Sequence, residues 1–88
     1  MIRNSDFIKR KIGTQFVIVA TGAATKKFNG MISVNATGSF IWDQLDCDKS
    51  LEALVEAIVS EYEIDRETAL ADATAFVQKL MEVGAIVK

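Results

Sequence analysis

The chain has 88 residues, half of them hydrophobic, with no histidine and one cysteine. This length supports one domain with one modest core and leaves little room for a deep catalytic cleft. The net charge of −2 hides an uneven distribution, because residues 1–34 have six basic side chains against one acidic and residues 35–88 have four against eleven. The first part, at +5, either steers an acidic partner or weakly attracts the second part, at −7.

No segment has the pattern of a membrane span or a secretion signal. The longest apolar run, residues 16–20, is far too short to cross a bilayer, and no long apolar stretch follows a basic one. We therefore expect a cytoplasmic protein with a single domain over residues 1–88. Cys47 fits a reducing compartment, and without a histidine in the chain it lacks the usual base partner of a nucleophilic thiol.

Two strands and a tight turn are predicted near the beginning of the chain. Phe7–Ile12 alternates imperfectly between apolar and polar residues, as in a half-buried strand. A turn at Gly13 leads to Gln15–Ala20, which is apolar on both faces. A strand of this kind is central and covered on two sides, or it lies near an oligomer contact.

A third strand is predicted over Met31–Val34, directly before the first helix. Asn29 and Gly30 suit a type I′ turn, so residues 24–28 either form a short ribbon with this strand or remain a loop. In the second case Met31–Val34 pairs only with Gln15–Ala20. In either case the strand is short, and at a sheet edge it leaves one row of backbone groups free to pair with another chain. The free donors are expected to include the N–H of Val34.

Three helices follow, each preceded by a residue whose side chain can cap it. Their expected extents are about Ala36–Leu45 after Asn35, Leu51–Tyr62 after Ser50, and from Asp65 to about Val83, where Gly84 ends the helix. Residues 85–87 can close the domain as an extended segment.

The third helix has a wider apolar face than a three-helix core requires. The residues expected to face the core are Leu70, Ala73, Val77, Leu80 and Met81, and this stripe is widened by Ala69, Phe76 and Val83. The small residues along its first half leave shallow space, which is either a groove or close helix packing.

The sequence contains no convincing catalytic, metal or cofactor motif. Asp46, Asp48 and Ser50 have the spacing of a calcium loop, but Leu51 stands in place of its glycine and Ala57 in place of its final glutamate. There is no Cys-x-x-Cys pair, no glycine-rich nucleotide loop and no P-loop. We therefore expect no catalytic residue, no metal and no cofactor.

The predicted architecture is α+β, an N-terminal three-stranded antiparallel sheet followed by a three-helix bundle, which resembles a winged helix-turn-helix. A DNA-binding protein of this class places basic residues on its recognition helix. The second helix lacks them, and the third has only Arg66 and Lys79 among acidic residues. A degenerate winged-helix regulator therefore remains a minor alternative, and no nucleic-acid partner is expected.

Residues 28–42, Phe-Asn-Gly-Met-Ile-Ser-Val-Asn-Ala-Thr-Gly-Ser-Phe-Ile-Trp, resemble the signature of the PqqD-like family. The members of this family are recognition elements for ribosomally made, modified peptides. The resemblance spans nearly the whole chain, because the strands before this segment, the link at residues 62–65 and the last helix also match. The departures are mild: Ala36 replaces a common acidic residue, and Ser39 a common alanine.

The resemblance implies a non-catalytic peptide-binding chaperone. Such a domain binds the leader segment of a precursor peptide and presents it to a modifying enzyme, such as a radical S-adenosylmethionine enzyme or a leader protease. The leader adds as a strand to the third strand and lies against the last helix. Here main-chain pairing falls on Met31, Ile32, Ser33 and Val34, and side-chain pockets involve Ala69, Asp72, Ala73, Phe76 and Val77.

Other readings of the same residues stay open. The apolar ones could be ordinary core contacts, and Asp72 could simply face solvent. The apolar strand Gln15–Ala20 also fits a structural or dimerising module, so a homodimer is a further expectation.

Overall fold

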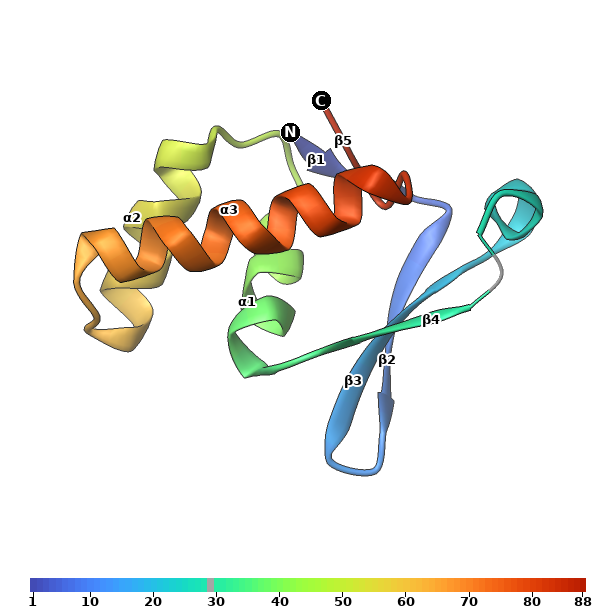
Figure 1. The fold of residues 1–88 in the computed structure, drawn as a ribbon, viewed down its shortest axis with the longest axis horizontal. Coiled ribbons are helices and arrows are strands. Elements are labelled where there is room, and N and C mark those ends of the chain that lie inside the picture. The colour runs from blue at the N-terminus through green and yellow to red at the C-terminus, as the bar shows by residue number, and fades with distance from the viewer. Residues whose placement is uncertain (29) are drawn as a thin grey trace.

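The computed structural model describes residues 1–28 and 30–88. The elements, in chain order, are β1 (Ile2–Arg3), β2 (Phe7–Ile12), β3 (Gln15–Ala20), the 3₁₀ helix η1 (Gly22–Lys26), β4 (Met31–Val34), α1 (Ala36–Gln44), α2 (Leu51–Tyr62), α3 (Arg66–Glu82) and β5 (Ile86–Val87). The sheet precedes the three helices and lies to one side of them (Figure 1). The predicted α+β architecture is confirmed.

The main sheet has the strand order β2-β3-β4, and both neighbouring pairs are antiparallel. Gly13 has φ +63°, which a type II′ turn requires at its first central residue. The two-residue loop therefore joins β2 and β3 as expected. Strand β4 pairs with β3 on one side only, and its other side is an edge of the sheet.

Of the two alternatives for residues 24–28, a short ribbon with β4 or a loop, the ribbon does not form, because most of this segment belongs to η1. The N–H of Ala24 donates to the carbonyl of Thr21 (3.2 Å), and the N–H groups of Lys27 and Phe28 donate to that of Ala24 (3.1 and 2.9 Å). These local hydrogen bonds satisfy the backbone without a strand partner. Asn29, which was expected in a type I′ turn, lies outside the described residues.

The three predicted caps are all present. Asn35 Oδ1 accepts the N–H of Gly38 at 2.8 Å, Ser50 Oγ that of Ala53 at 3.1 Å, and Asp65 Oδ1 that of Thr68 at 3.2 Å. Each cap satisfies one of the donors that a helix start leaves unpaired. The chain then leaves α3 at Gly84, whose φ of +81° is the left-handed conformation expected after a helix.

The two ends of the chain meet in a small second sheet. Strand β5 pairs antiparallel with β1, and the N–H of Asn4 donates to the carbonyl of Ala85 at 2.8 Å. The extended C-terminal segment is thus confirmed, whereas its partner β1 has no signal in the sequence. A strand of two residues is too short to show alternation, so only its partner reveals it.

The core lies between the sheet and the helices. Its largest fully buried side chains are Ile18, Ile41, Leu45, Leu54, Val55, Ile58, Leu80 and Ile86. On α3 the prediction for Leu70 is wrong, since its side chain is 46% exposed, and Ala69 is fully buried instead. The small side chain of Ala69 allows α3 to approach its neighbours closely, which a leucine at that position would prevent.

An ion pair connects the sheet to the first helix. Lys9 Nζ lies 2.7 and 2.8 Å from the carboxylate oxygens of Asp43 and 2.8 Å from Ser39 Oγ. Lys9 is mostly covered, and its ammonium group also lies 5.1 Å from the ring centre of Phe16. At this point the basic first part and the acidic second part of the chain attract each other directly.

Some apolar side chains of the sheet remain in solvent. Ile8, Ile12 and Met31 are 40%, 55% and 64% exposed. The register places Ile8 and Met31 on either side of Val19, on the face opposite the buried Ile18. Among the described residues, no helix is long and apolar enough to cross a membrane.

Candidate functional site

The hairpin determines which side of β3 each backbone group points to. Ile12 and Gln15 flank the two-residue loop and are directly paired, so they exchange both of their backbone hydrogen bonds. Bonded and non-bonded pairs then alternate along an antiparallel ladder. Every second residue of β3 from Gln15 onward is therefore bonded to β2. The residues between them, Phe16 and Ile18, turn their N–H and C=O groups toward β4.

The same alternation shows which groups of β4 are free. Its residues opposite Phe16 and Ile18 are Val34 and Ile32, whose N–H and C=O groups are therefore used inside the sheet. Met31 and Ser33 point theirs to the open side of the edge. The expectation of a free donor at Val34 is thus wrong. The hairpin was predicted from the sequence, but the register of β4 against β3, which decides which residues of β4 are bonded, was not.

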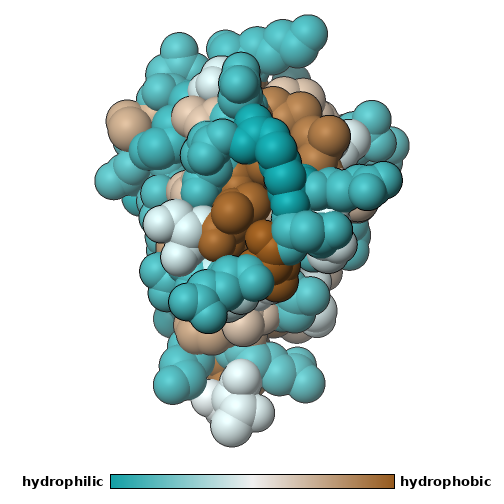
Figure 2. Space-filling view, turned by 90° about the vertical axis from the view of Figure 1, so that its left-hand side faces the viewer, coloured by the Kyte–Doolittle hydropathy of each residue, from teal (hydrophilic) through white to brown (hydrophobic). Residues whose placement is uncertain are grey.

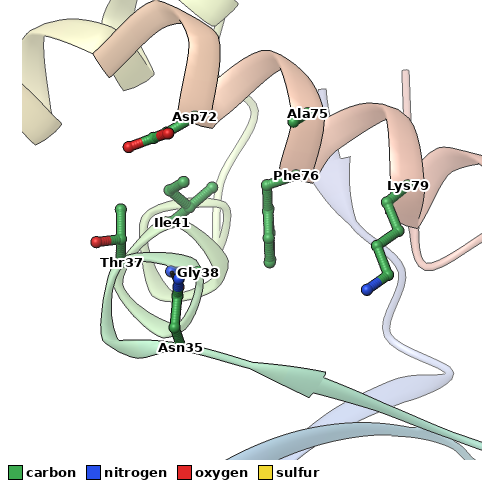
Figure 3. Close-up of a pocket in the computed structure, with 8 residues that line it drawn as sticks. All are labelled: Asn35, Thr37, Gly38, Ile41, Asp72, Ala75, Phe76 and Lys79. Atoms are coloured by element: carbon green, nitrogen blue, oxygen red, sulfur yellow. Dashed lines mark hydrogen bonds between the residues drawn. The ribbon is translucent and has the colours of Figure 1, made fainter. Parts of the chain in front are cut away.

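A groove lies beside the end of β4, between the start of α1 and the side of α3 that faces it (Figure 3). Its volume is about 280 Å³, and its lining residues are Asn35, Thr37, Gly38, Ile41, Asp72, Ala75, Phe76 and Lys79. The lining is apolar in the middle and polar at its ends. On the face at the left of Figure 1, hydrophobic residues gather in a central hollow that hydrophilic residues surround (Figure 2).

The side chain of Phe76 packs closely against Gly38 in the groove. The ring of Phe76 extends from α3 toward the first turn of α1 (Figure 3). A Cβ atom at Gly38 would lie 2.9 Å from Phe76 Cε1 and 3.2 Å from Val34 Cβ. The φ angle of Gly38 is not in the left-handed region, so its backbone conformation does not require a glycine. A glycine is needed here because Phe76 and Val34 approach too closely for a Cβ atom. The glycine allows the aromatic ring to rest on the helix backbone next to β4.

The structure separates the predicted site residues of α3 into two groups. Ala69, Ala73 and Val77 are buried in the core, so they do not line the groove. Asp72 is exposed, Phe76 is half-buried, and both line it. Ala69, Ala73 and Val77 recur at four-residue spacing on one helix face, and a face of small residues favours helix packing over a surface pocket.

Sequence reasoning missed Thr37, Ala75 and Lys79. Ala75 and Lys79 follow Asp72 by three and seven residues, the spacing of one face of a helix. This periodicity could have identified them once Asp72 and Phe76 were selected. Thr37 had no such signal, because its place in the groove depends on how α1 packs against α3.

The predicted residues of β4 divide by alternation. Ile32 is buried and Val34 half-buried on the core side, while Met31 and Ser33 are exposed on the other face. The main chain of Met31 and Ser33 and the side chains of Asp72 and Phe76 therefore form the accessible part of the predicted site. Within residues 1–28 and 30–88, no group of three or more His, Cys, Asp and Glu side chains could hold a metal ion.

Comparison with known proteins places this arrangement in a family. Residues 15–86 match the family described as coenzyme PQQ synthesis protein D (PqqD). The chain belongs to the PqqD family. Among solved structures, TbiB1 in complex with the TbiA(beta) leader peptide has a TM-score of 0.74 and 26% sequence identity to this chain, with 97% of this chain and 93% of that one covered. No curated protein matches.

Membership in the PqqD family agrees with the resemblance seen in residues 28–42. The match begins at β3 and ends within β5, so it contains β4, the groove and all three helices. The similarity to TbiB1 extends over nearly the whole of both chains.

Proposed function

We propose that this PqqD-family protein binds the leader segment of a ribosomally synthesised precursor peptide and presents it to a modifying enzyme, such as a radical S-adenosylmethionine enzyme or a leader protease. The peptide adds as a strand to the free edge of β4, and its side chains enter the groove between α1 and α3. Residues 1–88 act as one peptide-recognition domain, and the chemistry belongs to the partner enzyme.

The observation that carries the proposal is the free edge of β4 directly beside a groove. Met31 and Ser33 offer two N–H donors and two C=O acceptors, which any extended peptide can pair with. The groove offers the apolar Phe76 between polar ends, which adds selectivity. The complex of TbiB1 with a leader peptide, in a chain with the same fold, supports this choice of ligand.

The alternative of a DNA-binding regulator has little support from the charges. Arg66, at the start of α3, is paired with Glu52 and Glu56 of α2. These carboxylates hold the guanidinium group and raise the pKa of Arg66. A recognition helix presents such groups to phosphates instead.

The proposal is tested by removing one outward-facing donor of β4. Ser33→Pro deletes the N–H of Ser33, which points away from β3, so the sheet itself loses no hydrogen bond. Lys11→Pro is the matched control, because Lys11 has the equivalent outward-facing position on the opposite edge strand β2. Lys11→Ala measures the effect of the lost charge separately. Circular dichroism shows whether each variant is folded.

The probes are synthetic peptides that correspond to the short reading frames encoded beside this gene, titrated into the ¹⁵N-labelled protein. We expect the amides of β4 and of residues 72–79 to shift with one of them. Ser33→Pro should weaken this binding about tenfold, because it removes one hydrogen bond to the peptide and holds φ at about −65°, away from the usual strand value. Lys11→Pro should bind as Lys11→Ala does. Equal losses in the two proline variants, or unmoved amides with every peptide at high micromolar concentration, would contradict strand addition to β4.

A further inference from the structure

Three kinds of side chain follow one another along the groove face of α3. Asp72 is acidic, Ala75 and Phe76 are apolar, and Lys79 is basic. Figure 3 shows Asp72 on the side of Thr37, at the start of α1, and Lys79 extending toward the strand that leads into Asn35. The groove therefore has a negative end near α1 and a positive end over β4.

These two end charges are free, whereas other charges connect parts of the fold. Lys9 is paired with Asp43, the N-terminal amine with Asp48, and Arg66 with glutamates of α2. Within the described residues, neither Asp72 nor Lys79 takes part in a salt bridge or a side-chain hydrogen bond. Both are exposed, and each can pair with an incoming charge.

The spacing of the charges fits an extended chain. Asp72 and Lys79 are seven residues apart, which is about 10 Å along a helix. Alternate residues of a strand point to the same side, so residues i, i+2 and i+4 of a bound peptide face the groove over about 13 Å. The difference of roughly 3 Å is within the reach of the flexible lysine side chain.

We propose that Asp72 and Lys79 are two separate, opposite charges that together select leader segments with a basic, an apolar and an acidic residue at alternate positions. This inference rests on the proposed function and names the peptide class for the same site. The basic residue pairs with Asp72, the apolar residue contacts Phe76, and the acidic residue pairs with Lys79.

The order of the charges follows from the direction of β4. In Figure 1, α3 runs from the α2 side of the molecule toward β1 and β5, and β4 runs the opposite way. A peptide that pairs antiparallel with β4, the more stable arrangement, therefore runs in the same sense as α3. Its basic residue precedes its acidic residue, which gives the pattern (Lys/Arg)-x-(apolar)-x-(Asp/Glu).

The test uses four synthetic fluorescein-labelled twelve-residue peptides with identical Ser and Thr flanks. Their central segments are Lys-Thr-Leu-Thr-Asp, the reverse Asp-Thr-Leu-Thr-Lys, and the two like-charged forms with Lys or Asp at both ends. Affinities are measured by fluorescence anisotropy. The protein variant reverses the pair, Asp72→Lys with Lys79→Asp. The control variant Glu82→Lys with Lys88→Glu exchanges two exposed charges that do not line the groove and leaves the net charge unchanged.

We expect Lys-Thr-Leu-Thr-Asp to bind about tenfold more tightly than its reverse, because two surface ion pairs are replaced by two repulsions. The reversed variant should prefer the reversed peptide, and the control variant should behave as the native protein. In 1 M NaCl the preference should fall to about twofold.

The outcomes distinguish this inference from the proposed function. If all four peptides bind equally and shift the amides of β4, strand addition stands and the charge selection is refuted. The same holds if the reversed variant keeps the native preference. If Asp72 only stabilises the start of α1 through its helix dipole, Asp72→Asn lowers Tm without changing the order of affinities, which also refutes the selection. If none of the four peptides binds while a peptide encoded beside the gene shifts the amides of β4, the charge selection is refuted and the proposed function stands. If that peptide also leaves the amides unmoved, both fail.

Discussion

The contact between Gly38 and Phe76 provides a sharp test of how the groove is built. In Gly38→Ala the new methyl group would lie 2.9 Å from Phe76 Cε1, 3.1 Å from Cδ1 and 3.2 Å from Val34 Cβ. Real Cβ atoms essentially never come as close as the first distance, so the ring has to move. Because the first turn of α1 blocks one side of the ring, the open side is the groove itself.

The expected change in stability is the difference between two opposing effects. Overpacking a buried site costs about 1–3 kcal/mol, whereas replacing glycine by alanine in a helix contributes up to about 1 kcal/mol. We expect a net loss of about 1 kcal/mol, which lowers Tm by roughly 4–8 °C in a domain of this size. The displaced ring should also fill the groove and weaken peptide binding.

Thermal unfolding and the peptide titration described above measure both effects. Phe76→Leu is the partner variant, because a shorter side chain leaves space for the added methyl group. The double variant Gly38→Ala/Phe76→Leu should be more stable than the sum of the single changes predicts, which a double-mutant cycle detects. If Gly38→Ala is as stable as the native protein, binds peptide normally and shows no coupling to Phe76, the close approach does not shape the groove.

Two further changes test the rest of the fold. Lys9→Met keeps the apolar stem but removes the ion pair with Asp43 and the hydrogen bond to Ser39. It should lower the free energy of unfolding, measured in urea, by about 1–2 kcal/mol. A loss below about 0.3 kcal/mol would show that this ion pair does not hold α1 to the sheet. Asp65 caps α3, and its hydrogen bonds with Thr68 lower the pKa of its carboxyl group. A lowered pKa contributes stability that is complete above the unfolded value of about 4 and is lost as the pH falls through the folded value. The free energy of unfolding of Asp65→Asn should therefore change less between pH 5 and pH 2 than that of the native protein. Identical pH profiles of the two proteins would contradict this role of Asp65.

Much of the fold is determined by local sequence. The caps at Asn35, Ser50 and Asp65 and the glycine at position 84 indicate the ends of the helices, because each satisfies a backbone requirement within a few residues. The hairpin at Gly13 follows from its two-residue spacing in the same way. These elements need no distant partner to be recognised, so the sequence was sufficient to predict them.

Sequence reasoning was wrong about Leu70, did not predict β1 and left residues 24–28 open, because the state of each depends on which other elements lie beside it. Leu70 and Ala69 are neighbours on α3, and only the packing of the other helices decides that the smaller one is buried. Strand β1 exists because β5 lies beside it, although nearly the whole chain separates them. For residues 24–28 the sequence left open a ribbon with Met31–Val34 or a loop, and the segment has no strand partner because η1 satisfies its backbone locally.

The candidate site shows the same division. Local sequence patterns predicted the edge strand Met31–Val34 and a wide apolar face on α3 that includes Phe76. Asp72 and Phe76 were named as site residues through the resemblance to the PqqD-like family. The tertiary structure decided which of these groups are accessible. It turned the backbone of Met31 and Ser33 outward through the parity of the ladder, placed Ala73 in the core, and brought Lys79 into the groove at the end near β4. The physical reason is that a backbone or side-chain group is free only when no other element uses it, and this depends on contacts between residues far apart in the chain.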